Sequence, residues 1–512
     1  MKQYEMNEFT FEGKIPEGSQ AQVDVQAVFT CGEESVSVKG FYAGEGRYKV
    51  RFYPRQTGLY QWKVTGAVQA QGEEQCEASG AAHGIVKADG LHFKYEDGTR
   101  YQPIGTTIYA LVHQEKELVD TTMKTLSEAP FNKVRFCVFP KSYDFNQNDP
   151  QFYAFEKTDG KFDVHKPCFA FWEELEMRIA QLGSMGIEGD LILFHPYDRW
   201  GFSEFDREEC LVYLDYLERR LAAYPNLWWS LANEFDLMGH FKEEWWSEFA
   251  AFVASNDPYG HLLSNHNCFG YWDFNNEHTT HCCIQDTCVD DVPLLQKKYN
   301  KPVVFDECCY EGNIIHPWGN ISAFEMVNRF WTAMVCGGYC THGETYMDEN
   351  DVLWWAKGGV LHGESPARIA FLREIMESLP GPVDSCLSGL SLISLEHLQA
   401  IKNAQEAGQE LPEGMNNPFV ARLLTMSDDR IKEFVSRHRE ILGHCGEDAY
   451  IRYYRRQCTS IGELNLPENG SYRVDVIDVW EMTRTPALQG VSGKVRVKLP
   501  GKEGIAVLAV RE

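Results

Sequence analysis

Long apolar segments are missing from this sequence. None of its 512 residues lies in a run of about 18 apolar residues, so we expect no membrane-spanning helix. The first residues, MKQYEMNEFTFEG, contain no apolar stretch of the kind that forms a secretory signal. Internal repeats and low-complexity tracts are absent as well. These absences favour a cytoplasmic protein that is not built from repeats.

Basic residues are also scarce. The chain has 48 Lys and Arg against 75 Asp and Glu, which gives a formal net charge of -27. A charge of this sign repels nucleic acid and anionic lipid, so we expect neither as a partner. This net charge neither attracts nor repels neutral sugars. The sequence leaves open whether the chain forms a homo-oligomer.

Metal-binding motifs are weak or absent. The 16 cysteines include no CxxC pair of zinc spacing, and the HExxH motif does not occur. His278 and His281, beside Cys282, form an HxxH cluster that could contribute ligands, but alone it is weak support. We expect no metal and no cofactor, and we interpret the cysteines as small apolar core residues that stay reduced.

Hydrophobic patterning divides the chain into three parts. Residues 1–84 contain short runs that alternate apolar and polar side chains, which predicts an Ig-like β-sandwich of six or seven strands. Residues 85–382 alternate short apolar runs with helical periodicity, as in repeated βα units. Residues 383–512 begin with mixed, partly helical sequence, around 396–407 and 429–442, and end in alternating strands, which predicts a C-terminal β-sandwich domain.

The middle part fits a (β/α)8 TIM barrel, so the expected fold class is α/β with flanking β domains. The eight strands are expected at 102–111, 132–139, 187–194, 227–232, 261–265, 280–284, 302–305 and 338–341. The connection after the fifth strand is short, so one helix there is expected to be reduced.

Two of these strands end in acidic residues. The stretch from Leu227 to Asp236, LWWSLANEFD, reads as a buried strand that ends by presenting Asn233 and Glu234 side by side. The stretch from Lys301 to Glu307, KPVVFDE, is again a β-branched run that stops on an acid. Barrel enzymes keep their chemistry at the carboxyl ends of the strands, and glycoside cleavage needs two carboxyl groups.

With this pair of motifs in order, the chain resembles the retaining glycoside hydrolases of clan A, a group that includes cellulases, β-mannanases and β-galactosidases. In that clan the acid/base Glu follows Asn at the end of strand 4, and the nucleophile Glu ends strand 7. The resemblance therefore implies Glu234 as acid/base, Glu307 as nucleophile and Asn233 as a sugar-binding residue.

The resemblance is closer to one branch of the clan, the cellulase-like barrels related to apiosidases, which often carry N-terminal and C-terminal β domains. It covers nearly the whole chain and specifies the architecture, but it leaves the substrate open. The stretches that carry it are GFYAGEGRYKVRFYPRQTGLYQW, FDECCYEGN, GGYCTHGETY and VDVIDVWEMT.

Further substrate-binding candidates follow from position. Arg135 on strand 2 matches a clan Arg that holds the nucleophile ionised, or it is a rim residue. His195, in FHPYDRW, matches a site His of the clan, or it is a buried structural His. His266 and Gln285 end strands 5 and 6, where they could hold sugar hydroxyls or only cap loops.

More candidates follow strands 7 and 8. Tyr310 comes after the nucleophile, and His342 and Glu344 come after strand 8. The clan commonly has a Trp at the end of strand 8, which this sequence lacks. Trp355, beside Trp354, could replace that sugar platform, or the pair could belong to the core.

The function expected is that of a retaining O-glycosyl hydrolase acting on short plant-derived or dietary β-type glycosides, in an exo mode. The long segment 140–167 after strand 2, with Tyr143, Phe145, Phe152, Tyr153 and Phe155, is expected to help close a pocket around one or two sugars. An endo-acting β-glycanase is the alternative within the enzyme class. A catalytically inactive carbohydrate-binding protein is the alternative outside it.

Overall fold

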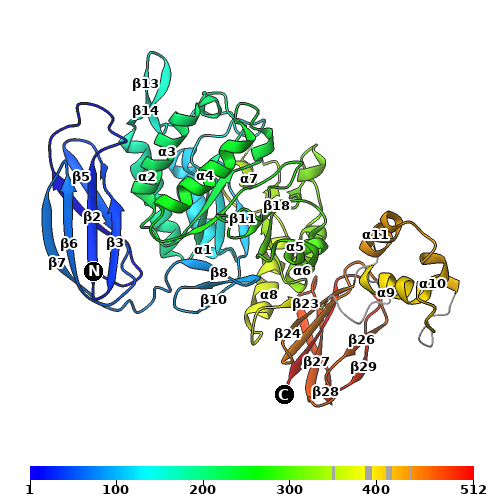
Figure 1. The fold of residues 1–512 in the computed structure, drawn as a ribbon. Helices are drawn as coiled ribbons and strands as arrows, with labels where there is room; N and C mark the ends of the chain where they lie inside the picture. Colours follow the sequence, from blue (N-terminus) through cyan, green and yellow to red (C-terminus); the bar gives the residue numbers. More distant parts are fainter. Residues whose placement is uncertain (349–351, 387–394, 411–417, 438–439) are drawn as a thin grey trace. The chain divides into compact units, whose positions relative to one another are not determined.

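The computed structural model describes residues 1–348, 352–386, 395–410, 418–437 and 440–512 (Figure 1). They form two compact units. One holds residues 1–287, 295–326 and 339–370, and the other holds residues 288–294, 327–338 and 371–512. Parts of the expected elements lie outside the described residues: 349–351 after strand 8, and 387–394, 411–417 and 438–439 of the C-terminal region. None of the described helices is both long and apolar enough to cross a lipid bilayer.

The chain begins with the expected β-sandwich. Its two antiparallel sheets have the strand orders β1-β5-β4 and β3-β2-β6-β7. In β2 alternate side chains are buried because they face the opposite sheet. Phe29 of β2 stacks on Phe52 of β5 with ring centroids 3.9 Å apart. The strands are β1 (Asn7–Glu12), β2 (Val25–Cys31), β3 (Glu34–Lys39), β4 (Phe41–Tyr42), β5 (Arg47–Phe52), β6 (Gly58–Gly66) and β7 (Ala70–Cys76).

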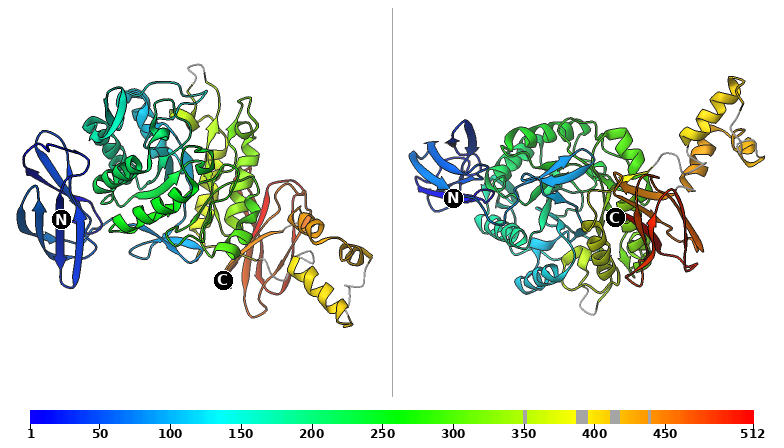
Figure 2. Two further views of the ribbon diagram at one scale, coloured as in Figure 1. Left: turned by 45° about the horizontal axis from the view of Figure 1, so that its top comes forward. Right: turned by 90° about the horizontal axis from the view of Figure 1, so that it is seen from below.

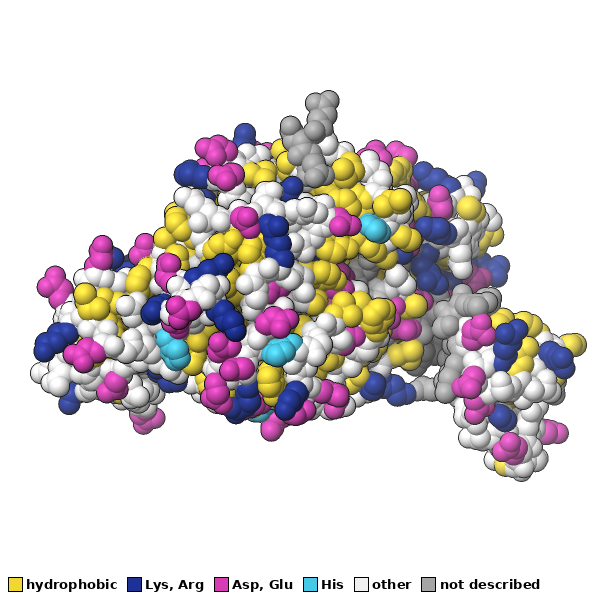
Figure 3. All heavy atoms as spheres, turned by 90° about the horizontal axis from the view of Figure 1, so that it is seen from above, with side chains coloured by type: hydrophobic (Ala, Val, Ile, Leu, Met, Phe, Trp, Pro, Cys, Tyr) yellow, Lys and Arg dark blue, Asp and Glu magenta, His cyan; other side chains and the backbone are white. Residues whose placement is uncertain are grey.

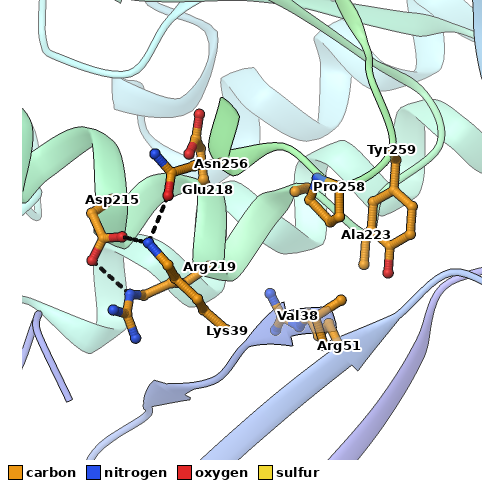
Figure 4. A pocket seen from close by; sticks show the side chains of 11 residues that line it. Val38, Lys39, Arg51, Asp215, Glu218, Arg219, Ala223, Asn256, Pro258 and Tyr259 are labelled. Atoms are coloured by element: carbon orange, nitrogen blue, oxygen red, sulfur yellow. Dashed lines mark hydrogen bonds and ion pairs between the residues drawn. The ribbon is translucent and has the colours of Figure 1, made fainter. Parts of the chain in front are cut away.

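Charged side chains join the sandwich to the helices that follow. The buried Arg51 of β5 donates to Glu176 at 2.7 Å, and Glu176 also accepts from Arg220. Nearby, Lys39 of β3 donates to Asp215 at 2.7 Å and to Asn256 at 2.6 Å (Figure 4). The pairs of Glu176 with Arg51 and Arg220 are buried on both sides, whereas the Lys39 side chain is partly exposed.

A small antiparallel sheet that the sequence analysis did not anticipate precedes the barrel. It has the order β10-β9-β8, formed by β8 (Val86–Asp89), β9 (His92–Tyr95) and β10 (Arg100–Tyr101). Phe93 of this sheet packs on Trp228 with ring centroids 5.1 Å apart. Because Trp228 lies near the start of its strand, the sheet covers the amino end of the barrel.

The eight expected parallel strands form one sheet, in the order β17-β16-β15-β12-β11-β21-β19-β18. An isolated bridge between His266 and Cys283 joins its two edges, so the barrel is nearly closed. The prediction of a (β/α)8 barrel is thus confirmed. The strands are β11 (Gly105–Thr107), β12 (Lys133–Cys137), β15 (Glu188–Phe194), β16 (Leu227–Ala232), β17 (Leu262–Ser264), β18 (Cys282–Gln285), β19 (Val303–Glu307) and β21 (Tyr339–His342).

Helices connect these strands, and α1 to α4 lie on the outer side of the sheet (Figures 1 and 2). Residues 265–281, all of them described, form no helix, which confirms the reduced connection after strand 5. The hairpin of β13 (Phe155–Thr158) and β14 (Lys161–Pro167) lies in the long segment after β12. The helices are α1 (Lys116–Glu128), α2 (Phe169–Ser184), α3 (Arg207–Leu221), α4 (Glu243–Asn256), α5 (Val292–Tyr299), α6 (Ala323–Val335), α7 (Trp354–Lys357) and α8 (Ser365–Glu377).

The second compact unit contains the C-terminal β domain. Its main antiparallel sheet has the order β23-β24-β25-β30-β27-β28, and β26 pairs with β29. Val474, Val507 and Leu464 are among the residues of its core. The strands are β23 (Asp384–Ser385), β24 (Ile441–Cys445), β25 (Ala449–Tyr453), β26 (Ile461–Asn465), β27 (Tyr472–Asp478), β28 (Thr483–Val491), β29 (Lys494–Lys498) and β30 (Ile505–Arg511), with helices α9 (Leu395–Glu406), α10 (Pro418–Leu423) and α11 (Asp428–Arg437).

Candidate active site

A cavity of about 530 Å³ lies at the carboxyl ends of the barrel strands. This is within the range of small-molecule sites. Figure 3 looks onto the face that carries the loops after these strands, where hydrophobic side chains gather near the middle. The residues that line the cavity are Tyr109, Lys141, Tyr143, Tyr197, Asn233, Glu234, Cys268, Phe269, Tyr271, Gln285, Asp286, Thr287, Glu307, Cys309, Tyr310, Trp318 and Trp355.

Strand β16 delivers Glu234 to the cavity. All six residues of β16 are buried, including Trp228 and Trp229, so the strand is fixed on both faces. Glu234 follows with φ 55° and ψ 57°, a left-handed conformation that few residues other than Gly adopt. Its backbone amide donates to Nδ1 of His266 at 3.3 Å. Strained backbone of this kind persists where surrounding contacts hold it, and it is frequent at functional sites.

The Glu234 carboxylate accepts hydrogen bonds from three side chains. Tyr197 donates to Oε2, and Gln285 donates from Nε2 to Oε1 at 3.1 Å. Asn233 donates from Nδ2 to Oε2 at 3.3 Å. The carboxylate is therefore oriented from both sides and still reaches the cavity wall.

Glu307 ends strand β19 and also reaches the cavity. Burial raises the pKa of its carboxyl group to about 8, and a hydrogen bond from Tyr310 acts in the opposite direction. Tyr109 donates to Oε1, and Nη1 of Arg135 lies 3.6 Å from the same oxygen. The ionised form of Glu307 thus has a guanidinium and two hydroxyl groups beside it, while desolvation opposes ionisation.

One side chain connects the surroundings of the two carboxylates. Asn233 accepts from Nη1 of Arg135 at 2.9 Å through Oδ1, and it donates to Glu234 through Nδ2. Because Arg135 also lies beside Glu307, the chain of contacts runs from one glutamate to the other. The two carboxylates therefore face the same part of the cavity.

Arg135 is fully buried below this array. Its Nε lies 3.7 Å from Asp190, which is paired with Lys133 at 2.6 Å. Lys133 also contacts Asp306 at 2.6 Å. Paired charges of both signs can remain ionised in the barrel interior, so they hold the guanidinium in place.

His266 lies close to both glutamates. Since its Nδ1 accepts from the Glu234 amide, the proton of the neutral ring sits on Nε2, which lies 3.9 Å from Oε1 of Glu307. Burial lowers the pKa of His266 well below its usual value, so the ring stays neutral. His266 is near the candidate acid and nucleophile but does not line the cavity.

Aromatic rings form one wall. Trp355 of α7 lies 5.0 Å from Trp318 and 5.5 Å from Tyr109 between ring centroids. Tyr143 lies 5.5 Å from Trp355. Of the five aromatic residues named in the segment 140–167, only Tyr143 lines the cavity. Trp354 is buried instead and donates to Thr106 at 2.8 Å.

Among the other predicted residues, the structure brings Gln285 and Tyr310 to the cavity wall but not His195, His342 or Glu344. His195 is buried and hydrogen-bonded to the Phe139 carbonyl at 3.1 Å. His342 stacks on Phe131 with ring centroids 4.8 Å apart. Both histidine rings are buried and neither lines the cavity.

Glu344 belongs to a buried group with Glu311 and His342, whose possible ligand atoms lie within 4.8 Å of one another. The two carboxylates are already hydrogen-bonded. Glu344 accepts from the amides of His362 and Gly363, and Glu311 accepts from those of Glu364 and Ser365. These bonds fix the segment before α8, and we assign no metal to the group.

Several residues that line the cavity were not predicted from the sequence. The main ones are Tyr109, Lys141 and Tyr197. Lys141 is buried, with Nζ 3.4 Å from the centroid of the Tyr109 ring and 4.3 Å from that of Tyr197. A weak signal existed for Tyr197, because it lies in the FHPYDRW stretch that also contains His195. Nothing in the local sequence distinguished the other two.

Comparisons with known proteins define the class of this molecule. A family model described as "Apiosidase-like, catalytic domain" matches residues 87–380. Two further models, both for domains of unknown function, match residues 1–67 and 439–510. The search of curated proteins returned no match. The barrel, its two strand-end glutamates and these matches define an O-glycosyl hydrolase.

The solved structures agree with this class. A candidate glycoside hydrolase from Bacteroides vulgatus is 32% identical with a TM-score of 0.84, and the match covers 100% of this chain and 99% of that one. A glycoside hydrolase family 5 protein from Bacteroides vulgatus, 15% identical with a TM-score of 0.62, shares the fold over 84% of this chain and 94% of that one. The chain belongs to the apiosidase-like glycoside hydrolases.

Proposed function

We propose that the enzyme cleaves short β-glycosides of plant or dietary origin with retention of configuration, with Glu307 as nucleophile and Glu234 as acid/base. The observation that carries this proposal is the array of Asn233, Arg135 and Tyr109, which connects the carboxylates at the ends of β16 and β19. Retaining glycosidases need two carboxyl groups that reach the same glycosidic bond.

In the first step, an oxygen of ionised Glu307 attacks the anomeric carbon and the bond to the glycosidic oxygen breaks. The proton of the Glu234 carboxyl group passes to that oxygen, so the leaving group departs as a neutral alcohol. The hydroxyl of Tyr109 and the guanidinium of Arg135 support the charge of Glu307 before attack. Asn233 would donate from Nδ2 to the sugar 2-hydroxyl, a contact that strengthens in the transition state.

In the second step, the ionised Glu234 takes a proton from water while the water oxygen attacks the anomeric carbon. Glu307 is released and the sugar leaves with its original configuration. Tyr197 and Gln285 hold the Glu234 carboxylate from both sides, which keeps one group in position for both proton transfers.

The walls support a short substrate and an exo mode. Tyr143, from the long segment after β12, packs against Trp355 of α7, so parts of the chain far apart in sequence enclose the same side of the cavity. A cavity of about 530 Å³ holds one or two sugar units. An endo-acting glycanase would instead require an open groove.

Every residue that lines the cavity lies between Tyr109 and Trp355. We therefore place catalysis in residues 85–382, and we assign residues 1–84 and 383–512 to two non-catalytic β domains. The buried state of Phe41, Tyr48, Phe52 and Tyr60 supports a structural role for the first of these domains.

The test is the stereochemistry of the first product. A panel of nitrophenyl glycosides identifies a hydrolysed substrate, and proton NMR then follows the anomer that appears first. A β product from a β substrate is the expected result. An α product would refute the double displacement, and no release from any glycoside would favour a carbohydrate-binding protein.

A further inference from the structure

An exposed aromatic ring stands at the rim of the cavity. Phe269 lines the cavity, yet it has a relative exposure of 84%. Leaving so large an apolar side chain in water forgoes the free energy that its burial would supply. Ile315 is similarly exposed at 88% but does not line the cavity. Of these two residues, only Phe269 is placed to meet a ligand in the site.

Hydrogen bonds to the backbone hold the loop that carries Phe269. The carboxylate of Asp236 accepts hydrogen bonds from the amides of Cys268, Phe269 and Gly270 at 2.6, 2.7 and 2.9 Å. Charge-assisted bonds of this kind are among the stronger ones in proteins. Since Asp236 lies two residues after Glu234, the exposed ring is tied to the segment that carries the proposed acid/base.

Several polar groups around Phe269 are hydrogen-bonded within the protein, while Oε1 of Gln285 is buried without a hydrogen-bond partner among the described residues. Tyr271 donates to Asp286 at 2.5 Å, and Gln285 donates to Glu234 at 3.1 Å. Both oxygens of Asp236 are taken by the loop amides. Cys268, Phe269 and Tyr271 are the residues that this loop contributes to the cavity wall, and two of the three are aromatic.

The chemistry of the proposed reaction says which part of a substrate would meet this surface. Glu234 transfers its proton to the glycosidic oxygen, so the group bonded to that oxygen leaves on the Glu234 side of the cavity. Cys268, Phe269 and Tyr271 line the cavity on that side, through the bonds of their loop to Asp236. Glu307 and Tyr310 instead lie beside the sugar that becomes bound to the enzyme.

We propose that Phe269 and Tyr271 form the leaving-group subsite and that this subsite binds a planar aromatic aglycone. The inference rests on the proposed function and adds the chemical class of the leaving group. An aromatic aglycone can stack on the exposed ring of Phe269 without needing hydrogen bonds. The acidic groups nearby, Glu234 and Asp286, disfavour an anionic leaving group.

The first experiment compares leaving groups on one sugar. The full-length Phe269→Ala variant is assayed on the nitrophenyl glycoside and on the methyl glycoside of the sugar that the wild type releases. We expect the ratio of kcat/KM for the aryl substrate to kcat/KM for the methyl substrate to fall roughly threefold to tenfold in the variant. Ile315→Ala is the matched control for loss of an exposed side chain, and Phe269→Tyr should retain the aryl preference.

The second experiment uses the glycosyl-enzyme, from which the leaving group has gone. After labelling with a 2-deoxy-2-fluoro glycoside, hydrolysis of the intermediate is measured in the wild type and in Phe269→Ala as the reference rate for each protein. Transfer of the sugar to benzyl alcohol should be slower in the variant, because this acceptor must occupy the same subsite.

Three outcomes would overturn the inference. They are an equal loss on aryl and methyl substrates, an unchanged transfer to benzyl alcohol, and a wild-type preference for a disaccharide over the aryl glycoside. Each leaves the proposed function standing, because glycosyl-enzyme still forms. If no glycosyl-enzyme forms and no glycoside is cleaved, the proposed function fails, and this inference fails with it.

Discussion

The ammonium of Lys141 lies 3.4 Å from the centroid of the Tyr109 ring, and the hydroxyl of Tyr109 donates to Glu307. The same ammonium lies 4.3 Å from the ring of Tyr197, which donates to Glu234. A single buried cation thus contacts the two tyrosines that hold the two catalytic candidates. Burial lowers the pKa of Lys141 to about 8, so the group is charged at neutral pH.

Replacing Lys141 should therefore disturb both glutamates at once. We expect Lys141→Met to lower kcat/KM roughly tenfold to thirtyfold, because a desolvated cation–π contact contributes about 2 kcal/mol to the position of each ring. Steady-state kinetics measure the effect. Lys157→Met is the matched control, since Lys157 lies 4.7 Å over the Phe162 ring in the β13–β14 hairpin and away from the cavity. Equal kinetics in the two variants would contradict this role.

Azide should restore activity to alanine variants of both glutamates, but the two variants should give different products. Glu307→Ala and Glu234→Ala are each expected to lower turnover by roughly three orders of magnitude or more, because each removes a whole catalytic function. Azide should partly restore both variants and give glycosyl azides of opposite anomeric configuration, α from Glu307→Ala and β from Glu234→Ala for a β substrate. Product NMR measures this. Near wild-type turnover in either variant would refute the assignment.

The pH dependence of kcat/KM should follow the ionisation of Glu307. As the proposed nucleophile, Glu307 must be ionised, and burial raises its pKa to about 8, so kcat/KM should rise as the pH increases toward 8. Tyr109→Phe removes a donor that favours the charged form, and the rising limb should then move to higher pH. A pH profile of kcat/KM for both proteins decides this. A rising limb at the same pH in both would exclude Tyr109 as a support of the carboxylate.

Glu218 in α3 should limit stability at neutral and alkaline pH. Both of its carboxylate oxygens are buried without a hydrogen-bond partner among the described residues, beside the contact of Lys39 with Asp215 (Figure 4). Burial raises the pKa of Glu218 well above its ordinary value of 4.5. The unfolded chain therefore releases this proton at lower pH than the folded protein does, and stability falls as the pH rises above that value.

Glu218→Gln removes this titration. We expect the variant to unfold about 1 to 2 °C higher than the wild type at pH 8, the shift that corresponds to about 1 kcal/mol in a unit of this size, and at the same temperature near pH 4. Thermal unfolding at both pH values is the measurement. Glu208→Gln, at an exposed position of the same helix, is the control and should leave the unfolding temperature unchanged at both pH values. A lower unfolding temperature at pH 8 would mean that Glu218 is ionised and bound by a partner.

Product length should distinguish the two modes of cleavage. With a labelled oligosaccharide ladder, mass spectrometry should show release of single units from the non-reducing end, because the aromatic wall around Tyr143 and Trp355 closes one side of the cavity. An early spread of mid-length fragments would indicate an open cleft and an endo-acting enzyme.

The sequence by itself determined the barrel and both candidate carboxylates. Short, largely apolar runs such as that of β16 indicate buried parallel strands when they alternate with helical segments, and an acid at the end of such a strand lies at the carboxyl face of the barrel. The local pattern therefore placed Asn233, Glu234 and Glu307 at strand ends, and the resemblance to clan A implied their roles. Arg135 was named from that resemblance as well.

Only the tertiary structure decided which other side chains meet these carboxylates. Tyr109, Lys141 and Tyr197 follow three different strands, and their contacts depend on loop paths that carry no local periodicity. Conversely, His342 ends β21 and Glu344 follows it, as expected of site residues, yet His342 packs on Phe131 and Glu344 binds backbone amides before α8. Strand position fixes the end of the barrel at which a residue lies. The direction of its side chain is set by long-range packing and hydrogen bonding.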